Sequence, residues 1–223
     1  MEQQVKTTSR AKKPRREWMI AAALVVLSFV PSIAGIARLT SLGNQAAINP
    51  DNARFLTSPV PITLHVVASL VFGLIGAFQF LPSFRQRNIQ WHRTAGKWLM
   101  GAGLISALTG LWMTVFYTIP QPLQGSLLYI VRLLVGVGMA LSIYLAWTTI
   151  RAKNVSAHKA WMMRAYALGQ GAGTQVVIFL PYIALLGQPD QLTRDILMSL
   201  AWVMNLVYAE WLLRPHFPKS VAV

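Results

Sequence analysis

The chain has 223 residues, of which 55% are hydrophobic and 12% are charged. Soluble domains carry about twice that share of charged residues, so this composition excludes an ordinary soluble domain. The sequence contains no cysteine, which excludes disulfides, thiolate metal sites and cysteine nucleophiles.

Long segments without a charged residue predict membrane-crossing helices, because a helix needs about 20 apolar residues to span the hydrocarbon core. Proline, glycine and charged residues mark the ends of these segments. In chain order, six spans are predicted, at residues 18–38, 61–82, 95–117, 126–150, 159–186 and 193–213. The sequence therefore predicts an all-α polytopic transmembrane helix bundle over residues 18–213, between a basic cytoplasmic tail at 1–17 and a cytoplasmic tail at 214–223.

The first span follows a basic leader and therefore also resembles a secretory signal peptide. Its apolar run, from Met19 to Val30, is followed by small residues at 34–37. We favour a retained anchor, because the run is long enough to span and a leader of seventeen residues is long for a bacterial signal. Cleavage of this segment is the alternative.

The basic residues predict the orientation, because cytoplasmic loops of membrane proteins carry an excess of Lys and Arg. The formal net charge is +14. Fifteen of the twenty basic residues lie in two tails and two connectors on one side: Lys6, Arg10, Lys12, Lys13, Arg15, Arg16, Arg85, Arg87, Arg93, Lys97, Arg151, Lys153, Lys159, Arg214 and Lys219. The opposite side holds Arg38, Arg54 and Arg194. This asymmetry predicts cytoplasmic termini in the bacterial inner membrane, and it explains the charge without nucleic-acid binding.

The two cytoplasmic connectors share a pattern at an offset of 66 residues. Residues 85–93 and 151–159 both read Arg-x-basic-Asn-aliphatic-x-x-His-basic, which makes His92 and His158 equivalent. One interpretation is a parallel repeat that relates spans two and three to spans four and five. Independent convergence of two basic connectors is the other.

Ionisable side chains at membrane depth are costly, so each one is a candidate functional residue. Toward the cytoplasmic side these are His92, His158, Arg164 and Glu210, with the amide of Gln79. With nearby helix N-termini they could form a positively polarised site for a phospholipid headgroup, a quinone or a haem propionate. The alternative is structural: Arg164 and Glu210 neutralise each other, and the histidines cap helix starts.

A b-type haem is the most specific hypothesis for His92 and His158, since two neutral imidazoles can supply both axial ligands of one iron. The familiar di-haem bundle needs four histidines, two near each face. Here His65 is the one histidine toward the outside, and the fourth span has none. Histidine pairing therefore permits at most one haem, at the cytoplasmic face.

Toward the outside, His65 and Arg132 nearly coincide under the 66-residue offset. They could bind an anionic or quinone-like ligand from the outer leaflet. For Arg132 we favour a simpler interpretation: it lies about two helical turns from the surface, so its long side chain can reach the headgroups.

Motifs of soluble hydrolases and kinases give little support for an enzyme. The sequence has no His-Glu-x-x-His, no Gly-x-Ser-x-Gly and no phosphate-binding loop. Glu210 could serve a proton-coupled transporter, but transporters usually have longer chains and interrupted helices, and the sequence shows neither clearly.

A family resemblance rests on His65, the stretch Gly76 to Phe80, Arg85, the motif His92-Arg93-x-x-Gly96, and the segment His158-Lys159-Ala-Trp161-Met-Met-Arg164-Ala-Tyr166-Ala-Leu168. Together they resemble the bacterial predicted membrane proteins grouped as domain of unknown function 2306. The resemblance covers residues 62–181 and implies a multi-pass membrane protein without implying a particular activity. Where such proteins often carry a second Arg in the fifth span, this chain has Thr174 and Gln175. A similarity to cytochrome b561-like bundles rests on helix number and histidine placement alone.

The sequence as a whole predicts a multi-pass protein whose partner is the lipid bilayer. The expected function is to bind or move an anionic or lipid-like ligand through a polar site at the cytoplasmic face. Electron transfer through one bis-histidine haem b is the alternative. The sequence does not indicate an oligomeric state.

Overall fold

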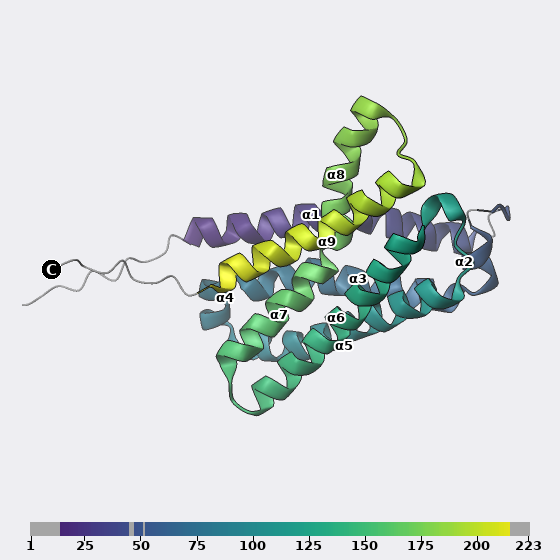
Figure 1. Cartoon of the computed structure of the whole chain (residues 1–223). Helices are drawn as coiled ribbons and strands as arrows, with labels where there is room; N and C mark the ends of the chain where they lie inside the picture. The colour runs from purple at the N-terminus through teal and green to yellow at the C-terminus, as the bar shows by residue number, and fades with distance from the viewer. Residues whose placement is uncertain (1–13, 45–46, 51, 215–223) are drawn as a thin grey trace, which may run out of the picture.

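The computed structural model describes residues 14–44, 47–50 and 52–214. Over these residues the chain is helical and has no strand, which confirms the predicted all-α fold. The predicted tails at 1–17 and 214–223 lie mostly outside the described residues. The elements, shown in Figure 1, are α1 (Pro14–Gly43), α2 (Ala53–Thr57), α3 (Pro59–Leu70), the π-helix η1 (Val71–Ile75), the 3₁₀-helix η2 (Ala77–Phe80), α4 (Pro82–Arg87), α5 (Ile89–Phe116), the 3₁₀-helix η3 (Gln121–Leu123), α6 (Ser126–Arg151), α7 (Val155–Gly169), α8 (Gly171–Leu186) and α9 (Gln191–Leu213).

Six segments can cross a membrane on length and composition. Five are α1, the run from α3 to η2, α5, α6 and α9, and the sixth is the bent pair of α7 and α8. These are the six predicted spans. α5 begins at Ile89, ahead of the predicted 95, because the basic connector continues the helix beyond the apolar run.

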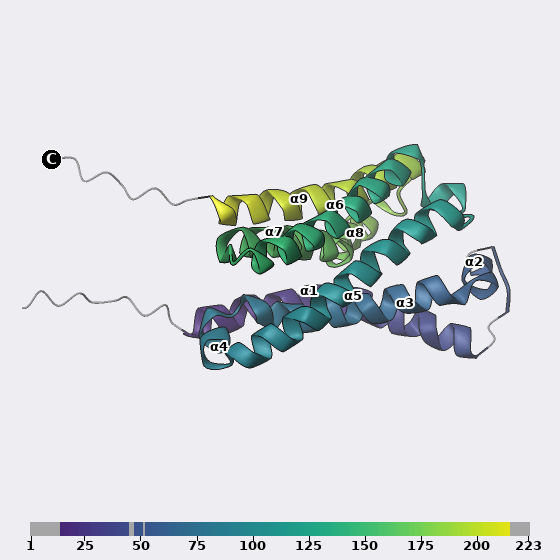
Figure 2. The ribbon, with the colours of Figure 1, turned by 90° about the horizontal axis from the view of Figure 1, so that it is seen from below.

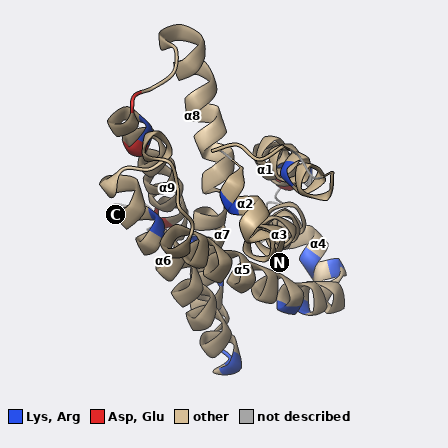
Figure 3. Cartoon of the chain, turned by 90° about the vertical axis from the view of Figure 1, so that its right-hand side faces the viewer, with Lys and Arg blue, Asp and Glu red and all other residues tan. Residues whose placement is uncertain are grey.

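The first helix begins and the last helix ends at the same end of the bundle, as an even number of spans requires. The start of α1 and the end of α9 lie at one end of the molecule in Figures 1 and 2. We call this the basic end, because α4 and the turn between α6 and α7 carry Lys and Arg there while most of the ribbon is uncharged (Figure 3). The opposite end, with α2, η3 and the α8–α9 turn, is called the far end. The assignment of the basic end to the cytoplasm stays a prediction.

The helices form two layers, which Figure 2 shows from the side. One layer contains α1, α3 and α5 with the short α4, and the other contains α6, α7, α8 and α9. Contacts of α5 with α6 and of α1 with α8 join the layers. Between them, Phe72 and Tyr166 belong to a buried apolar core, each at most 5% exposed.

The second span changes helix type halfway. α3 runs into the π-helix η1, the 3₁₀-helix η2 follows, and Leu81 is extended before α4 begins. Irregular backbone at membrane depth needs other partners for its polar groups. The Tyr166 hydroxyl provides one, by donating to the Gly73 carbonyl at 2.7 Å.

The fifth span is broken at Gln170, where α7 and α8 meet at a bend of 40°. A continuous helix over 159–186 was predicted from the apolar run, and that prediction is wrong. Glycines directly after the break allow close packing, because a Cβ at Gly171 would collide with the Trp202 indole and one at Gly173 with the Leu27 backbone carbonyl. The first turn of α8 therefore packs closely on α1 and α9. The rest of α8 projects away from the other helices (Figure 1).

Candidate ligand-binding site

A cavity of about 590 Å³ lies between the two layers. Residues from all six spans line it, together with Arg54 and Phe55 of α2 and with Tyr117 beyond the end of α5. It extends from the far end to the middle of the bundle, where Gly73 and Gln170 line it. The cavity therefore reaches both irregular spans.

Three arginines line this cavity: Arg54 of α2, Arg132 of α6 and Arg194 of α9. Arg132 lies within electrostatic range of the other two. The carboxylate of Asp195 is also within that range. Guanidinium groups that line one space can bind an anionic group there.

Asp195 neutralises only part of this charge, because its carboxylate has other partners. The side chain is 2% exposed and accepts hydrogen bonds from the backbone N–H groups of Gly125 and Leu128, each at 3.1 Å. Asp195 thus caps the start of α6 from the neighbouring helix α9. A carboxylate at a helix N-terminus is stabilised both by these donors and by the helix dipole.

The Arg132 side chain extends toward the start of α6, where Nη1 donates a hydrogen bond to Oε1 of Gln124. Its side chain lines the cavity, so the structure brings Arg132 and His65, the predicted outer pair, to the same space. The preferred interpretation from the sequence, that Arg132 reaches the headgroups, stays a prediction.

His65 has a defined tautomer in its neutral form. Its Nδ1 lies 2.9 Å from the Ser106 carbonyl and 3.2 Å from the Thr109 hydroxyl. Because a carbonyl can only accept, Nδ1 carries the proton and Nε2 is the acceptor atom of the ring. His65 also lines the cavity, so it adds a polar ring to the lining.

Aromatic rings line the cavity at the far end. The guanidinium carbons of Arg38 and Arg54 lie 4.6 Å and 4.4 Å from the Phe55 ring centroid. The ring of Tyr117 packs edge-on against Phe55, and its hydroxyl donates to the Ser58 carbonyl at 2.6 Å. Burial raises the pKa of the Tyr117 phenol, which keeps this donor protonated. These contacts position Arg54 beside the cavity.

Gln170 forms the inner wall, at the break of the fifth span. Its Oε1 accepts a hydrogen bond from the Ser28 hydroxyl at 3.0 Å, which links α1 to the break. Its Nε2 is buried beside the Tyr166 hydroxyl and has no hydrogen bond of good geometry among the described residues. A buried amide donor beside a cavity is a natural contact for an acceptor on a ligand.

At the basic end, Arg164 and Glu210 pair with each other. Nε donates to Oε1 at 2.5 Å and Nη2 donates to Oε2 at 3.0 Å, a bidentate arrangement. The Arg164 guanidinium also lies 4.5 Å from the Trp161 ring centroid. This geometry matches the structural alternative that the sequence left open, in which Arg164 and Glu210 neutralise each other.

The two cytoplasmic histidines occupy equivalent places. α5 begins at Ile89 and α7 at Val155, which are 66 residues apart, as are the histidines. In both helices the histidine backbone N–H bonds the carbonyl of the N-cap asparagine, from His92 to Asn88 and from His158 to Asn154, each at 3.0 Å. The shared register supports the parallel repeat.

The side chains of these histidines differ. Nδ1 of His158 lies 2.9 Å from the Ala146 carbonyl, whereas Nδ1 of His92 is buried with no hydrogen-bond partner. Gln79 lies close by on η2, and its Nε2 is likewise buried with no hydrogen-bond partner. These three residues and the Arg164–Glu210 pair are not among those that line the cavity.

The fit to a haem is partial. A metal-bound histidine almost always donates its second ring nitrogen to a carbonyl or carboxylate, and His158 has such a partner while His92 lacks one. Among the described residues, no group of three or more His, Asp and Glu could hold a metal ion. A haem between the two histidines stays a prediction.

Sequence reasoning missed four residues of the cavity region: Arg54, Gln170, Arg194 and Asp195. The two arginines were assigned to the outer side, Arg54 in the connector before the second span and Arg194 in the first turn of the span predicted at 193–213. Asp195 falls inside the predicted span 193–213, where an acid is costly unless it is paired, and that cost was a usable signal. For Gln170 the signal is its position between Gly169 and Gly171.

These features define the class: a polytopic α-helical membrane protein with a largely apolar cavity between its helices that three arginines help to line. Residues 62–213 match the family described as "Predicted membrane protein (DUF2306)", and the chain belongs to this family. The match confirms the resemblance predicted from the sequence and extends it through α9. No curated protein and no solved structure matches the chain.

Proposed function

We propose that this protein binds an anionic, lipid-like ligand in the cavity between its two helix layers, in the bacterial inner membrane. One observation carries the proposal: Arg54, Arg132 and Arg194 line a single space inside a bundle of membrane spans. The arginine guanidinium matches carboxylate and phosphate groups, which it can bind through two parallel hydrogen bonds.

The rest of the lining suits an apolar tail. Met139, Leu168, Met198 and Trp202 line the cavity beside the polar groups. Small-molecule sites are mostly apolar, with a few placed polar groups, and measure roughly 300–1,000 Å³. At about 590 Å³ the cavity lies inside that range. An amphiphile with a single anionic group would satisfy both parts of the lining.

The break in the fifth span supports movement of the ligand as well as binding. Interrupted helices at mid-membrane depth form the binding sites of many transporters, and their half-helices can shift against the bundle. Here the break at Gln170 lines the cavity, and Ala172 and Gly173 of α8 line it too. A change in the angle between α7 and α8 would therefore change the shape of the site.

The location differs from the cytoplasmic-face site expected from the sequence. Of that predicted set, Arg164 and Glu210 satisfy each other, whereas His65 and Arg132 of the outer pair line the cavity. The geometry therefore favours the outer pair as the ligand contacts.

The test is equilibrium binding of a labelled phosphatidylglycerol to the full-length protein in phosphatidylcholine nanodiscs. Losing a charge-assisted hydrogen bond costs about 1.5–3 kcal/mol, so Arg132→Gln and Arg194→Gln should each weaken binding about tenfold or more. Arg151→Gln, at the exposed basic end of α6, is the matched control and should bind like the wild type. Unchanged affinity in both cavity variants would overturn the proposal.

A further inference from the structure

Two side-chain nitrogens at the basic end are buried and have no hydrogen-bond partner within residues 14–44, 47–50 and 52–214: Nε2 of Gln79 and Nδ1 of His92. Leaving a buried polar group unpaired costs about 1–3 kcal/mol, and native proteins contain few such groups. Two of them on neighbouring elements, η2 and α5, therefore call for a shared partner.

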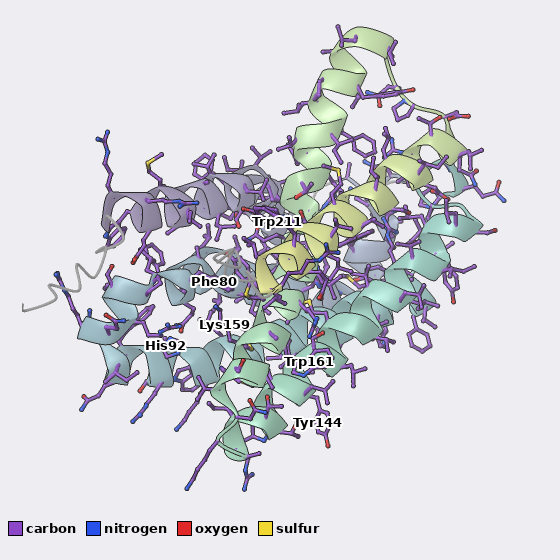
Figure 4. The ribbon with its side chains drawn as sticks, turned by 60° about the vertical axis from the view of Figure 1, so that its left-hand side comes forward. Phe80, His92, Tyr144, Lys159, Trp161 and Trp211 are labelled. Atoms are coloured by element: carbon purple, nitrogen blue, oxygen red, sulfur yellow. The ribbon has the colours of Figure 1, made fainter. Side chains whose placement is uncertain are left out.

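Packing places the Gln79 amide beside α5, on the face of that helix that carries His92. A Cβ built at Gly96 would lie 4.0 Å from Oε1 of Gln79. Gly96 follows His92 by four residues, and residues four apart on a helix share a face. The Gln79 amide thus lies beside the face of α5 that carries His92, at the position one helical turn further along the helix. Figure 4 shows His92 at this end of the bundle, with Lys159 at the start of α7.

The change of helix type explains how Gln79 reaches this position. η2 is a 3₁₀ turn that ends in the extended residue Leu81. The neighbouring Phe80 ring packs 4.8 Å from the Tyr166 ring, centroid to centroid, which holds the turn against α7. A continuous α-helix through residues 76–82 would rotate the Gln79 side chain away from this place.

The surroundings are positive. His92 lies within electrostatic range of Arg85, Arg93 and His158. The acids that the structure describes at this end have other partners: Glu17 accepts hydrogen bonds from the Ser83 N–H at 2.8 Å and its hydroxyl at 2.6 Å, and Glu210 accepts two from Arg164. A buried amide donor and an imidazole in a positive field suit an acceptor that carries negative charge.

We propose that Gln79 and His92 form a second site, separate from the cavity, that binds a phosphate group through hydrogen bonds from Gln79 Nε2 and His92 Nδ1. Neither residue lines the cavity, so the proposal stands independently of the proposed function. The phosphate can belong to the headgroup of a lipid or to free phosphate, because both offer the same acceptor oxygens.

The experiment uses the full-length protein in phosphatidylcholine nanodiscs with two probes, labelled phosphatidylglycerol and inorganic phosphate. The variants are Gln79→Leu and His92→Ala, and Gln90→Ala is the matched control because Gln90 is exposed on α5. Gln79→Leu should fold at least as well as the wild type without ligand, because it removes an unpaired buried donor.

The expected result is at least a tenfold weaker affinity of both site variants for one of the probes, with Gln90→Ala unchanged. A loss for phosphatidylglycerol assigns the site to a lipid, and a loss confined to inorganic phosphate assigns it to the free ion. Unchanged affinity of Gln79→Leu and His92→Ala for both probes overturns the site. Arg132→Gln separates the two proposals, since it should affect the cavity ligand and leave binding at Gln79 and His92 intact.

Discussion

The Tyr166 hydroxyl on α7 donates a hydrogen bond to the Gly73 carbonyl in the π-helix η1, over a distance of 2.7 Å. The Tyr166 ring also lies against Gly76, where a Cβ would come within 2.7 Å of the ring. Tyr166 precedes the break at Gln170 by four residues, so this contact joins the irregular part of the second span to that of the fifth. Tyr166 therefore links the irregular segments of the second and fifth spans through one hydrogen bond and one ring contact.

The first prediction concerns this connection. Tyr166→Phe keeps the ring and removes the donor to Gly73, which should lower the free energy of unfolding by about 1 kcal/mol. The measurement is thermal unfolding in detergent. Tyr144→Phe is the control, because Tyr144 is 61% exposed, and it should leave the unfolding temperature unchanged. Equal stability of Tyr166→Phe and the wild type would mean that the hydrogen bond contributes nothing.

The second prediction concerns Asp195, whose carboxylate caps α6 from α9. Asp195→Ala leaves two buried backbone N–H groups unpaired and should destabilise the protein by about 3 kcal/mol. Asp195→Asn retains one acceptor oxygen and should have an intermediate effect. Circular dichroism melts in detergent measure both, and a ranking in which Asn is worse than Ala would contradict the capping role.

Asp190 provides the contrast, since it caps α9 at an exposed position by accepting from the Thr193 N–H at 2.9 Å. Hydrogen bonds from the Thr193 side chain and backbone hold the pKa of Asp190 below its ordinary value. Its contribution is therefore complete above the ordinary pKa of an aspartate and is lost as the pH falls through the lowered value. Asp190→Ala should cost less than Asp195→Ala and should cost least at low pH.

The sequence predicted the spans well, because a lipid solvent imposes long apolar segments that are visible without any tertiary information. It also predicted that Arg164 and Glu210 could pair, since few charges are present at that depth. The break at Gln170 was not predicted, because an apolar composition alone does not distinguish a straight span from a bent one. The close approach of Leu27 and Trp202 to Gly173 and Gly171 beside the break is a tertiary contact, which composition does not contain.

The cavity could not be predicted from the sequence for a related reason. His65 and Arg132 could be picked out because each stands alone in an apolar run. Arg54 and Arg194 were assigned to the outer side without a functional role. They line one cavity because of where α2 and α9 lie relative to the other helices. Such convergence is a property of packing, which single-sequence periodicity does not contain.

The third prediction tests whether the Arg164–Glu210 pair is structural. The two side chains are 27% and 46% exposed, and exposed pairs contribute about 0.2–1 kcal/mol. Glu210→Arg should destabilise the protein by placing two cations together, and adding Arg164→Glu should restore most of the loss. Full restoration is not expected, because the contact of Arg164 with Trp161 is lost. A double variant as unstable as the single one would exclude pairing as the role.

The fourth prediction concerns haem at His92 and His158. Because His92 lacks the second hydrogen bond typical of a ligating histidine, we expect protein from haem-replete cells to show no bis-histidine band in its reduced-minus-oxidised spectrum. A stoichiometric band that disappears in both His92→Ala and His158→Ala, and persists in His65→Ala, would establish the electron-transfer alternative.

The last prediction fixes the orientation on which the cytoplasmic assignments depend. The chain has no cysteine, so a single introduced cysteine can be labelled without background. Gln86 of α4 at the basic end and Gln121 of η3 at the far end are both exposed, which makes them a matched pair. In intact cells a membrane-impermeant maleimide should label Gln121→Cys and spare Gln86→Cys, because the Lys- and Arg-rich connectors stay in the cytoplasm. Both variants should react after the membrane is opened. Labelling of Gln86→Cys in intact cells would place the basic end outside and would assign the Gln79–His92 site to the opposite leaflet.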